Sequence, residues 1–192
     1  MQNVSKSVLK IVTVGLMAAL VFAASNLSIN LFTVMGSPTR IHLGNILCLL
    51  SGLLFGSWLG GFSAGIGSSF FDLFNPLYIS SAPVTFAFKF LMGFTAGKIS
   101  HSGGFTGDNT KRNIIAAIVG QLLYIVLYLT KSLVESTMVG NAFQTALVDA
   151  GTKGLVSLIN GIIAVAVAVP LAAVIRKALR KTGFYSLIEQ AR

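Results

Sequence analysis

The chain has 192 residues, of which 54% are hydrophobic and only 10% are charged. A soluble domain carries about a quarter charged residues, so this composition excludes an ordinary water-soluble fold and indicates that lipid is part of the solvent. The net charge of +9 does not indicate nucleic-acid binding, because the basic residues lie mainly between and after apolar runs. The single cysteine, Cys48, excludes an internal disulfide and a cysteine-based metal cluster.

Six apolar segments are predicted to cross a membrane, since a spanning helix needs roughly 20 residues and about 17 are tolerated. In chain order they cover residues 8–25, 41–55, 58–71, 83–99, 113–133 and 152–175. The Gly56–Ser57 pair predicts a tight turn between the second and third segments. Polar stretches over 26–39, 72–83 and 135–151 are expected to be connectors. The sequence therefore predicts an all-α membrane protein, a compact six-helix bundle that forms one domain over residues 1–192.

Six crossings place both chain ends on one side of the membrane, and the basic residues indicate which side. The ends and the connectors on that side carry Lys6, Lys10, Lys98, Lys111, Arg112, Arg176, Lys177, Arg180, Lys181 and Arg192. The opposite side, with the nearby helix portions, carries only Arg40, Lys89, Lys131 and Lys153. Because cytoplasmic loops are enriched in Lys and Arg, both termini are expected to be cytoplasmic.

Small residues allow helices to approach closely in a membrane, where no hydrophobic force drives their association. They recur at four-residue spacing as Gly15, Ala19 and Ala23 in the first segment, Gly61 and Gly65 in the third, and Gly93 and Gly97 in the fourth. Internal packing is the expected role of most of them. The stripe on the first segment fits internal packing and the docking of a partner subunit equally well.

Polar side chains within the spans gather in the half away from the termini. Gln121, Tyr124, Tyr128 and Lys131 are three or four residues apart and share one face of the fifth helix. The remaining candidates are Arg40, His42, Asn45, Asp72, Asn75, Tyr78, Lys89, Lys153 and Asn160. Because ionisable groups inside a bilayer are costly, these residues predict a substrate-binding cup open to the outside. The inner ends are expected to be closed by glycines, alkyl groups and solvent-facing cations.

Several of these residues also fit structural roles. Asp72 suits an ion pair with Arg40 or Lys89, and the lysines of the last two spans suit snorkelling to the head groups. Tyr124 and Tyr128 also suit an aromatic belt at the membrane surface.

No enzyme signature occurs in the chain. It lacks a phosphate-binding glycine loop, a zinc-protease His-Glu-x-x-His pattern and a nucleophile elbow, so neither catalysis nor a cofactor is expected. The two histidines are isolated in the sequence, so no metal site is expected either.

Three motifs accompany the six-span pattern. The first is Ala19-x-x-x-Ala23, and the second is Arg-Ile-His-Leu-Gly-Asn over 40–45, which precedes Leu-Leu-Ser-Gly-Leu-Leu-Phe-Gly. The third is Lys-Phe-Leu-Met-Gly-Phe-x-x-Gly over 89–97. Together they make nearly the whole chain resemble the S components, or substrate-binding subunits, of energy-coupling factor (ECF) vitamin transporters. The resemblance implies a multi-pass protein of a prokaryotic plasma membrane that binds a micronutrient tightly from outside. It further implies docking, through Ala19 and Ala23, on a transmembrane scaffold driven by two cytoplasmic ATPases, with residues 26–39 as a lid.

The identity of the vitamin stays open at this stage. Basic residues outnumber acidic ones by one in the outer half, which would suit pantothenate or folate, but riboflavin, pyridoxine-type compounds and cobalamin remain candidates. Two other classes also remain: a gradient-driven secondary transporter of a small metabolite, and a membrane scaffold without a ligand. No inverted repeat or broken mid-membrane helix favours the secondary transporter.

Overall fold

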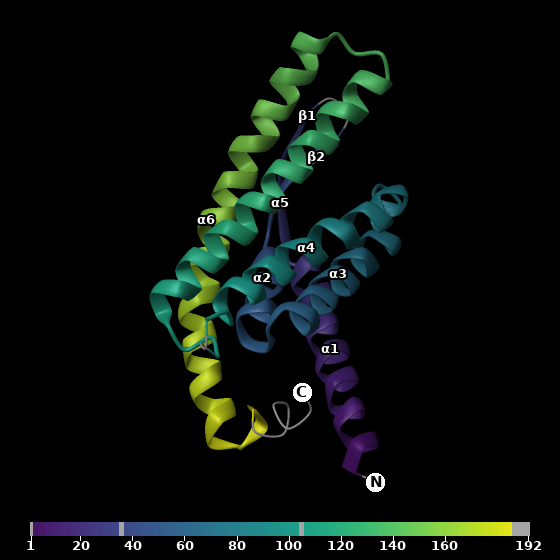
Figure 1. The fold of residues 1–192 in the computed structure, drawn as a ribbon. Helices are drawn as coiled ribbons and strands as arrows, with labels where there is room; N and C mark the ends of the chain where they lie inside the picture. Colours follow the sequence, from purple (N-terminus) through teal and green to yellow (C-terminus); the bar gives the residue numbers. More distant parts are fainter. Residues whose placement is uncertain (1, 35–36, 104–105, 186–192) are drawn as a thin grey trace.

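The computed structural model describes residues 2–34, 37–103 and 106–185, and it shows a bundle of six α-helices with one short β-hairpin (Figure 1). The elements are α1 (Gln2–Asn26), β1 (Ser28–Val34), β2 (Ser37–His42), α2 (Gly44–Phe55), α3 (Ser57–Leu73), the 3₁₀ turn η1 (Ile79–Ser81), α4 (Ala82–Ser100), α5 (Thr110–Met138) and α6 (Phe143–Lys181). The prediction of an all-α membrane protein is confirmed.

Four of the helical segments are long and apolar enough to cross a membrane: Ser7–Asn26, Ile79–Ser100, Thr110–Met138 and Phe143–Lys181. The other two are shorter, since α2 has 12 residues and α3 has 17. At 1.5 Å per residue α2 is only about 18 Å long, well short of a hydrocarbon core of about 30 Å. The start of α1 and the end of α6 lie at the same end of the bundle (Figure 1).

Helix α2 lies at the centre of the bundle, which explains how so short a helix can be stable in a membrane protein. It contacts all five other helices, and Cys48, Leu49 and Leu53 are fully enclosed. A helix that is apolar on every side is suited to burial. Because protein rather than lipid surrounds α2, its length does not have to match the bilayer.

Glycines bring α2, α3 and α4 into backbone contact. A Cβ atom on Gly52 would overlap the carbonyl oxygen of Gly93, and one on Gly93 would lie 2.7 Å from the carbonyl oxygen of Gly60. The predicted turn at Gly56 is confirmed, since α2 ends at Phe55, α3 begins at Ser57 and Gly56 has a φ of 82°. The glycines of the third and fourth segments therefore serve internal packing, as expected.

The expected polar connector over 26–39 is instead the antiparallel hairpin of β1 and β2, whose register pairs Ser28 with His42 and Val34 with Ser37. β-Branched residues in β1 favour the extended conformation. The strand β2 continues to His42, so the expectation of a helix from residue 41 is wrong, and α2 begins at Gly44.

The expected long connector over 135–151 is also wrong. Helix α5 continues to Met138 and α6 begins at Phe143, which leaves a turn of residues 139–142 with Gly140 at a φ of 89°. The start of α6 includes the strong helix formers Gln144, Ala146, Leu147 and Ala150, which help the helix to extend beyond the apolar core of the span. The α5–α6 hairpin consequently rises far above the other helices (Figure 1).

Candidate functional site

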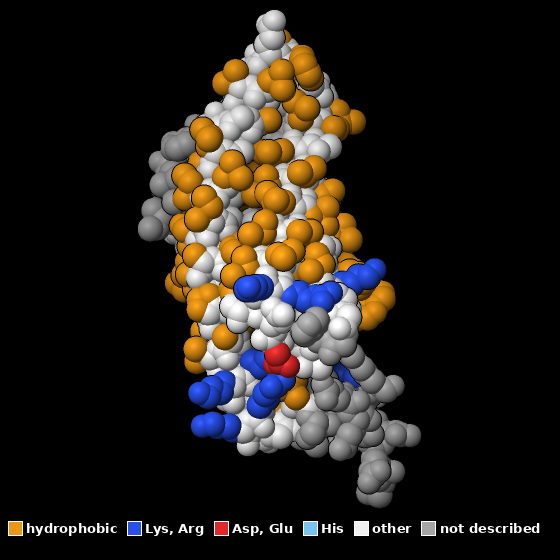
Figure 2. Space-filling model, turned by 60° about the vertical axis from the view of Figure 1, so that its left-hand side comes forward, with side chains coloured by type: hydrophobic (Ala, Val, Ile, Leu, Met, Phe, Trp, Pro, Cys, Tyr) orange, Lys and Arg blue, Asp and Glu red, His pale blue; other side chains and the backbone are white. Residues whose placement is uncertain are grey.

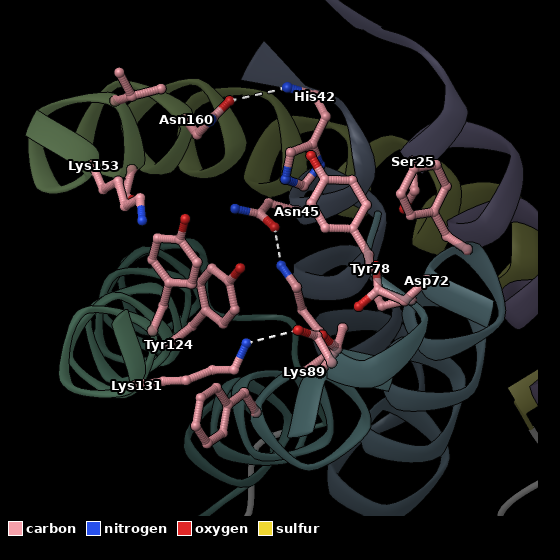
Figure 3. A pocket seen from close by; sticks show the side chains of 18 residues that line it. Ser25, His42, Asn45, Asp72, Tyr78, Lys89, Tyr124, Lys131, Lys153 and Asn160 are labelled. Carbon is pink, nitrogen blue, oxygen red and sulfur yellow. Dashed lines mark hydrogen bonds between the residues drawn. The ribbon is translucent and has the colours of Figure 1, made fainter. Parts of the chain in front are cut away.

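A polar cavity lies where α1, α2, α3 and α4 face the α5–α6 hairpin, and it has a volume of about 150 Å³ (Figure 3). All six helices contribute side chains to its walls, and β2 contributes His42. Ten of the predicted binding residues line it: His42, Asn45, Asp72, Tyr78, Lys89, Tyr124, Tyr128, Lys131, Lys153 and Asn160.

Lys89 of α4 reaches into the middle of this cavity, although its side chain is only 3% exposed. Its Nζ donates a hydrogen bond to Oδ1 of Asn45 at the start of α2. The same ammonium group lies 3.6 Å from the ring centroid of Tyr124, a cation–π contact. Asp72 of α3, which is 6% exposed, lines the wall beside Lys89 (Figure 3). A basic and an acidic side chain thus lie inside the bundle. Burying ionisable groups there costs free energy, so such residues usually pair with one another or mark a functional site.

The α5 wall of the cavity carries a pair of stacked tyrosines. The rings of Tyr124 and Tyr128 are 6.0 Å apart between centroids and only 18° from parallel. One turn further along α5, the Nζ of Lys131 donates to Oγ of Ser81 at 2.9 Å and lies 3.2 Å from a carboxylate oxygen of Glu135. The Lys131–Ser81 bond therefore ties α5 to η1 beside the cavity.

The α6 wall presents an amide and a cation. Oδ1 of Asn160 accepts a hydrogen bond from the backbone N–H of His42 at 3.2 Å, which fastens the end of the β-hairpin to α6 (Figure 3). Lys153, 12% exposed at its side chain, donates to Asp149 at 2.8 Å and to Ser132 of α5 at 3.0 Å. Asp149, a neighbour on the same helix, already neutralises this cation.

Of the other three predicted residues, Asn75 and Gln121 do not line the cavity. Arg40 lies in β2, and its side chain is outside the described part of the chain. Asn75 instead accepts a hydrogen bond from the backbone N–H of Leu77 at 3.1 Å, so it stabilises the turn after α3. Gln121 lies one turn inward from Tyr124, packs against Gly161 of α6 and is only 3% exposed. Neither side-chain polar atom of Gln121 has a hydrogen-bond partner among the described residues.

The cavity also contains residues that the sequence patterns did not single out as binding residues. They are Ser25, Ser68, Phe71, Ser81, Thr85, Phe88 and Val156. Helical spacing offers a signal for several of them, because Ser68 precedes Asp72 by four positions, and Ser81 and Thr85 precede Lys89 by eight and four. Extending each stripe one turn from a buried charge would have found Ser68 and Thr85, and a second turn would have reached Ser81.

One cation at the inner end contradicts the expectation that the cations there face solvent, whereas Lys98, Lys111 and Lys177 are exposed as expected. Arg176 of α6 is only 4% exposed, and its Nη2 donates to the carbonyl oxygen of Leu53 near the end of α2. The hydroxyl of Tyr185 donates to the carbonyl oxygen of Leu54 at 3.2 Å. The last carbonyls of a helix lack partners within the helix and carry partial negative charge, so a buried arginine is well placed there.

The segment between α4 and α5 closes this end further. Nδ2 of Asn113 donates to the carbonyl oxygen of Gly107 at 2.7 Å, and Asn109 caps α5 by accepting from the backbone N–H of Arg112 at 3.1 Å. At the surface, Asp108 accepts hydrogen bonds from Thr106, at 2.6 Å, and from Arg180. Burial alone would raise the pKa of the Asp108 carboxyl. The two hydrogen bonds and the charges of Arg180 and Arg176 outweigh burial and lower this pKa below its ordinary value.

The small stripe of α1 faces away from the bundle. Gly15, Ala19 and Ala23 are exposed, and a Cβ atom on Gly15 would meet no atom within 4 Å. The opposite face of α1 supplies the buried Met17 and Val21. The stripe therefore does not serve packing within this chain.

No group of three or more His, Cys, Asp or Glu side chains that could hold a metal ion occurs in residues 2–34, 37–103 and 106–185. The site is thus an arrangement of amide, hydroxyl, ammonium and aromatic groups around a cavity, which suits non-covalent recognition of an organic molecule.

Comparison with protein families agrees with this site. The family described as the ECF-type riboflavin transporter S component matches residues 5–177. The chain belongs to this family. This S component is therefore the substrate-binding membrane subunit of a vitamin transporter, and its family is not one of enzymes. Comparison with curated proteins gives no match.

Proposed function

We propose that this S component binds riboflavin or a close relative in the cavity and delivers it into the cell as part of an ATP-driven ECF importer. The observation that carries the proposal is the convergence of polar side chains from every helix on one cavity, in a chain whose family is described as riboflavin S components. The family description favours riboflavin over the acidic vitamins that the local charge alone would suit.

The chemistry of the cavity fits such a ligand. Riboflavin combines a flat, hydrogen-bonding ring system with a chain of hydroxyl groups. The parallel rings of Tyr124 and Tyr128 offer a flat aromatic wall, and aromatic surfaces favour offset stacking. Asn45 and Asn160 offer amide groups, and Lys89 offers a cation that can donate to carbonyl oxygens.

The size of the cavity indicates that binding requires widening. Its volume of about 150 Å³ is below the range of roughly 300–1,000 Å³ that holds drug-sized ligands. The α5–α6 hairpin is the part that can move without breaking the glycine contacts among α2, α3 and α4. We expect the Lys131–Ser81 bond to open during this widening, since it joins the hairpin to η1.

Titration of the purified protein in lipid nanodiscs with riboflavin tests the proposal. We expect saturable binding with quenching of flavin fluorescence by the tyrosine pair. Asn160→Ala should weaken the affinity by about 1–3 kcal/mol through the loss of a buried hydrogen bond. The matched control is Asn141→Ala, which removes an amide that bonds Ser136 away from the cavity.

An absence of saturable riboflavin binding by a folded protein, with binding of pantothenate or folate instead, would refute riboflavin as the ligand. Failure of every vitamin would refute the binding role itself. Native mass spectrometry of protein purified without added ligand gives an independent result, because a tightly bound vitamin should remain attached.

We further propose that both termini are cytoplasmic and that the exposed stripe of Gly15, Ala19 and Ala23 docks on the transmembrane scaffold. The basic residues at the chain ends support this orientation, and the exposed small side chains support close helix contact. Ala19→Leu with Ala23→Leu should abolish ATP-dependent uptake by the assembled transporter while riboflavin affinity stays unchanged. Leu20→Ala, on the exposed neighbouring face, is the control. Normal assembly and uptake by the double variant would refute the docking role.

A further inference from the structure

The α5–α6 hairpin ends in a surface that neither the cavity nor the scaffold contact explains. This surface, the helical tip, comprises residues 134–148 at the end of α5, the turn and the start of α6. Its hydrophobic side chains are unusually exposed: Met138 and Val139 are 82% exposed, Val148 is 70% exposed and Phe143 is 60% exposed. Such a surface needs a covering partner.

The length of the hairpin places this tip at a definite depth. Phe143 and Lys177, the first exposed cation of α6, are 34 positions apart, which is about 51 Å along the helix at 1.5 Å per residue. The hydrocarbon core is about 30 Å thick, and the whole bilayer is about 40–45 Å thick with its head groups. Even a tilt of about 40°, the upper end for such helices, leaves the tip beyond the hydrocarbon core when the basic end lies at the opposite surface.

The composition of the tip also fits the head-group layer. Glu135 is its only charged residue, and that carboxylate pairs with Lys131 at 3.2 Å. The other polar side chains, such as those of Thr137, Asn141 and Gln144, are uncharged and interspersed with apolar ones. Mixed apolar and neutral polar side chains are favourable where acyl chains meet head groups, and a tip without net charge does not require anionic lipid.

The lipid-facing surface of the two helices continues into the tip without a break. Figure 2 shows basic side chains gathered toward the lower part of the molecule and hydrophobic side chains covering the remaining length up to the top. The exposed side chains of Val126 on α5 and of Leu155 and Ile162 on α6 lie between the basic end of the hairpin and the tip. The tip is thus the end of a lipid-facing surface and not a separate patch suited to a protein partner.

We propose that the helical tip is an interfacial membrane anchor that lies in the head-group layer on the side of the cavity. Phe143, Val139 and Val148 insert into lipid at the boundary of head groups and acyl chains. Lys153, ten positions from Phe143 along α6, then lies about 15 Å below the anchored tip. A ligand in water must therefore enter next to the head groups, between the anchored hairpin and η1.

Depth-dependent fluorescence quenching tests the anchor directly, because Trp58 is the single tryptophan of the chain. The reporter is Phe143→Trp in a Trp58→Phe background, reconstituted in phosphatidylcholine vesicles that carry bromine at shallow or deep acyl positions. The matched control is Leu155→Trp in the same background, because Leu155 is 66% exposed and lies 12 positions, or about 18 Å, from Phe143, near the centre of the hydrocarbon core. A second reporter, Val139→Trp, serves if the first variant does not fold.

The anchor predicts a shallow-to-deep quenching ratio above one at position 143 and below one at position 155. Adding phosphatidylglycerol or salt should leave both ratios unchanged, since Lys131 neutralises Glu135, the one charged residue of the tip. Strong quenching at 143 by aqueous iodide without lipid quenching would place the tip in water and overturn the proposal. Protection from both quenchers would reveal a protein contact and overturn it equally. Neither result depends on which vitamin the cavity binds.

Discussion

At its N-terminal end α2 meets a cavity, whereas at its C-terminal end the same helix is capped by Arg176 and Tyr185. Both ends are polar and both contain a buried cation, yet the cations differ in what they contact. Lys89 bonds a side chain beside open space, and Arg176 bonds a backbone carbonyl in a fully packed region. A buried charge in a membrane protein therefore marks a binding site only where unfilled space adjoins it. The four predictions that follow test this distinction.

The largest expected effect is on stability at the inner end. Arg176→Ala removes a charged hydrogen bond and leaves a void, so it should lower the free energy of unfolding by about 3–5 kcal/mol. The ligand affinity of the folded fraction should not change. Thermal unfolding and ligand titration measure the two quantities, with Lys177→Ala as the exposed control on the same helix. A stable variant with weakened binding would contradict the assignment of Arg176 to structure.

Lys89→Met tests the outer end and should show the opposite pattern. It removes the bond to Asn45 and the contact with Tyr124, and hydrogen bonds to charged groups contribute about 1.5–3 kcal/mol. We expect a loss of ligand affinity of that size, measured by titration, with a smaller change in thermal stability. Lys98→Met, an exposed change on the same helix, should alter neither quantity. Unchanged affinity in Lys89→Met would exclude this lysine from the site.

Gln121→Leu tests whether Gln121 belongs to the packed core or to the cavity. Its amide is buried without a partner among the described residues, and such a group costs about 1–3 kcal/mol. Replacing it with leucine should raise the melting temperature and leave ligand affinity unchanged. Gln144→Leu, an exposed amide on α6, is the control. A loss of affinity in Gln121→Leu would instead show that the amide reaches the ligand.

The smallest effect concerns Asp108 at the surface of the inner end. Because its pKa is lowered in the folded protein, its stabilising contribution is complete above the pKa of an unfolded aspartate, near 3.9, and is lost as the pH falls through the folded value. Exposed ion pairs contribute about 1 kcal/mol at most. Asp108→Asn should therefore flatten the decline in melting temperature below about pH 4. An identical decline in wild type and variant would show that the Arg180 contact contributes nothing.

Much of the site was predictable because it depends on helical periodicity. Tyr124, Tyr128 and Lys131 share a face at any helix orientation, and their polarity turns that face away from lipid. The same spacing identified the small stripes of α1, α3 and α4, but it left the role of the α1 stripe open, and its exposure came from the structure. Their roles in ligand binding and docking remain predictions.

Three features could not be predicted, each because tertiary contacts decide them. Arg176 has the same local surroundings in sequence as the exposed Lys177, and only the position of α2 distinguishes the two. Gln121 continues the tyrosine stripe but lies one turn too deep to reach the cavity. The length of α5 and α6 was underestimated because apolar composition defines the lipid-embedded part of a helix and not the helix end.

The backbone contacts at Gly52, Gly60, Gly93 and Gly97 have a consequence for the diversity of cargo. Because no side chains separate their backbones at these positions, α2, α3 and α4 have no room to shift against one another and form one rigid unit. Re-engineering the protein for a different vitamin is therefore most practical on the opposite wall, where side chains of α5 and α6 can change in size without forcing apart two backbones.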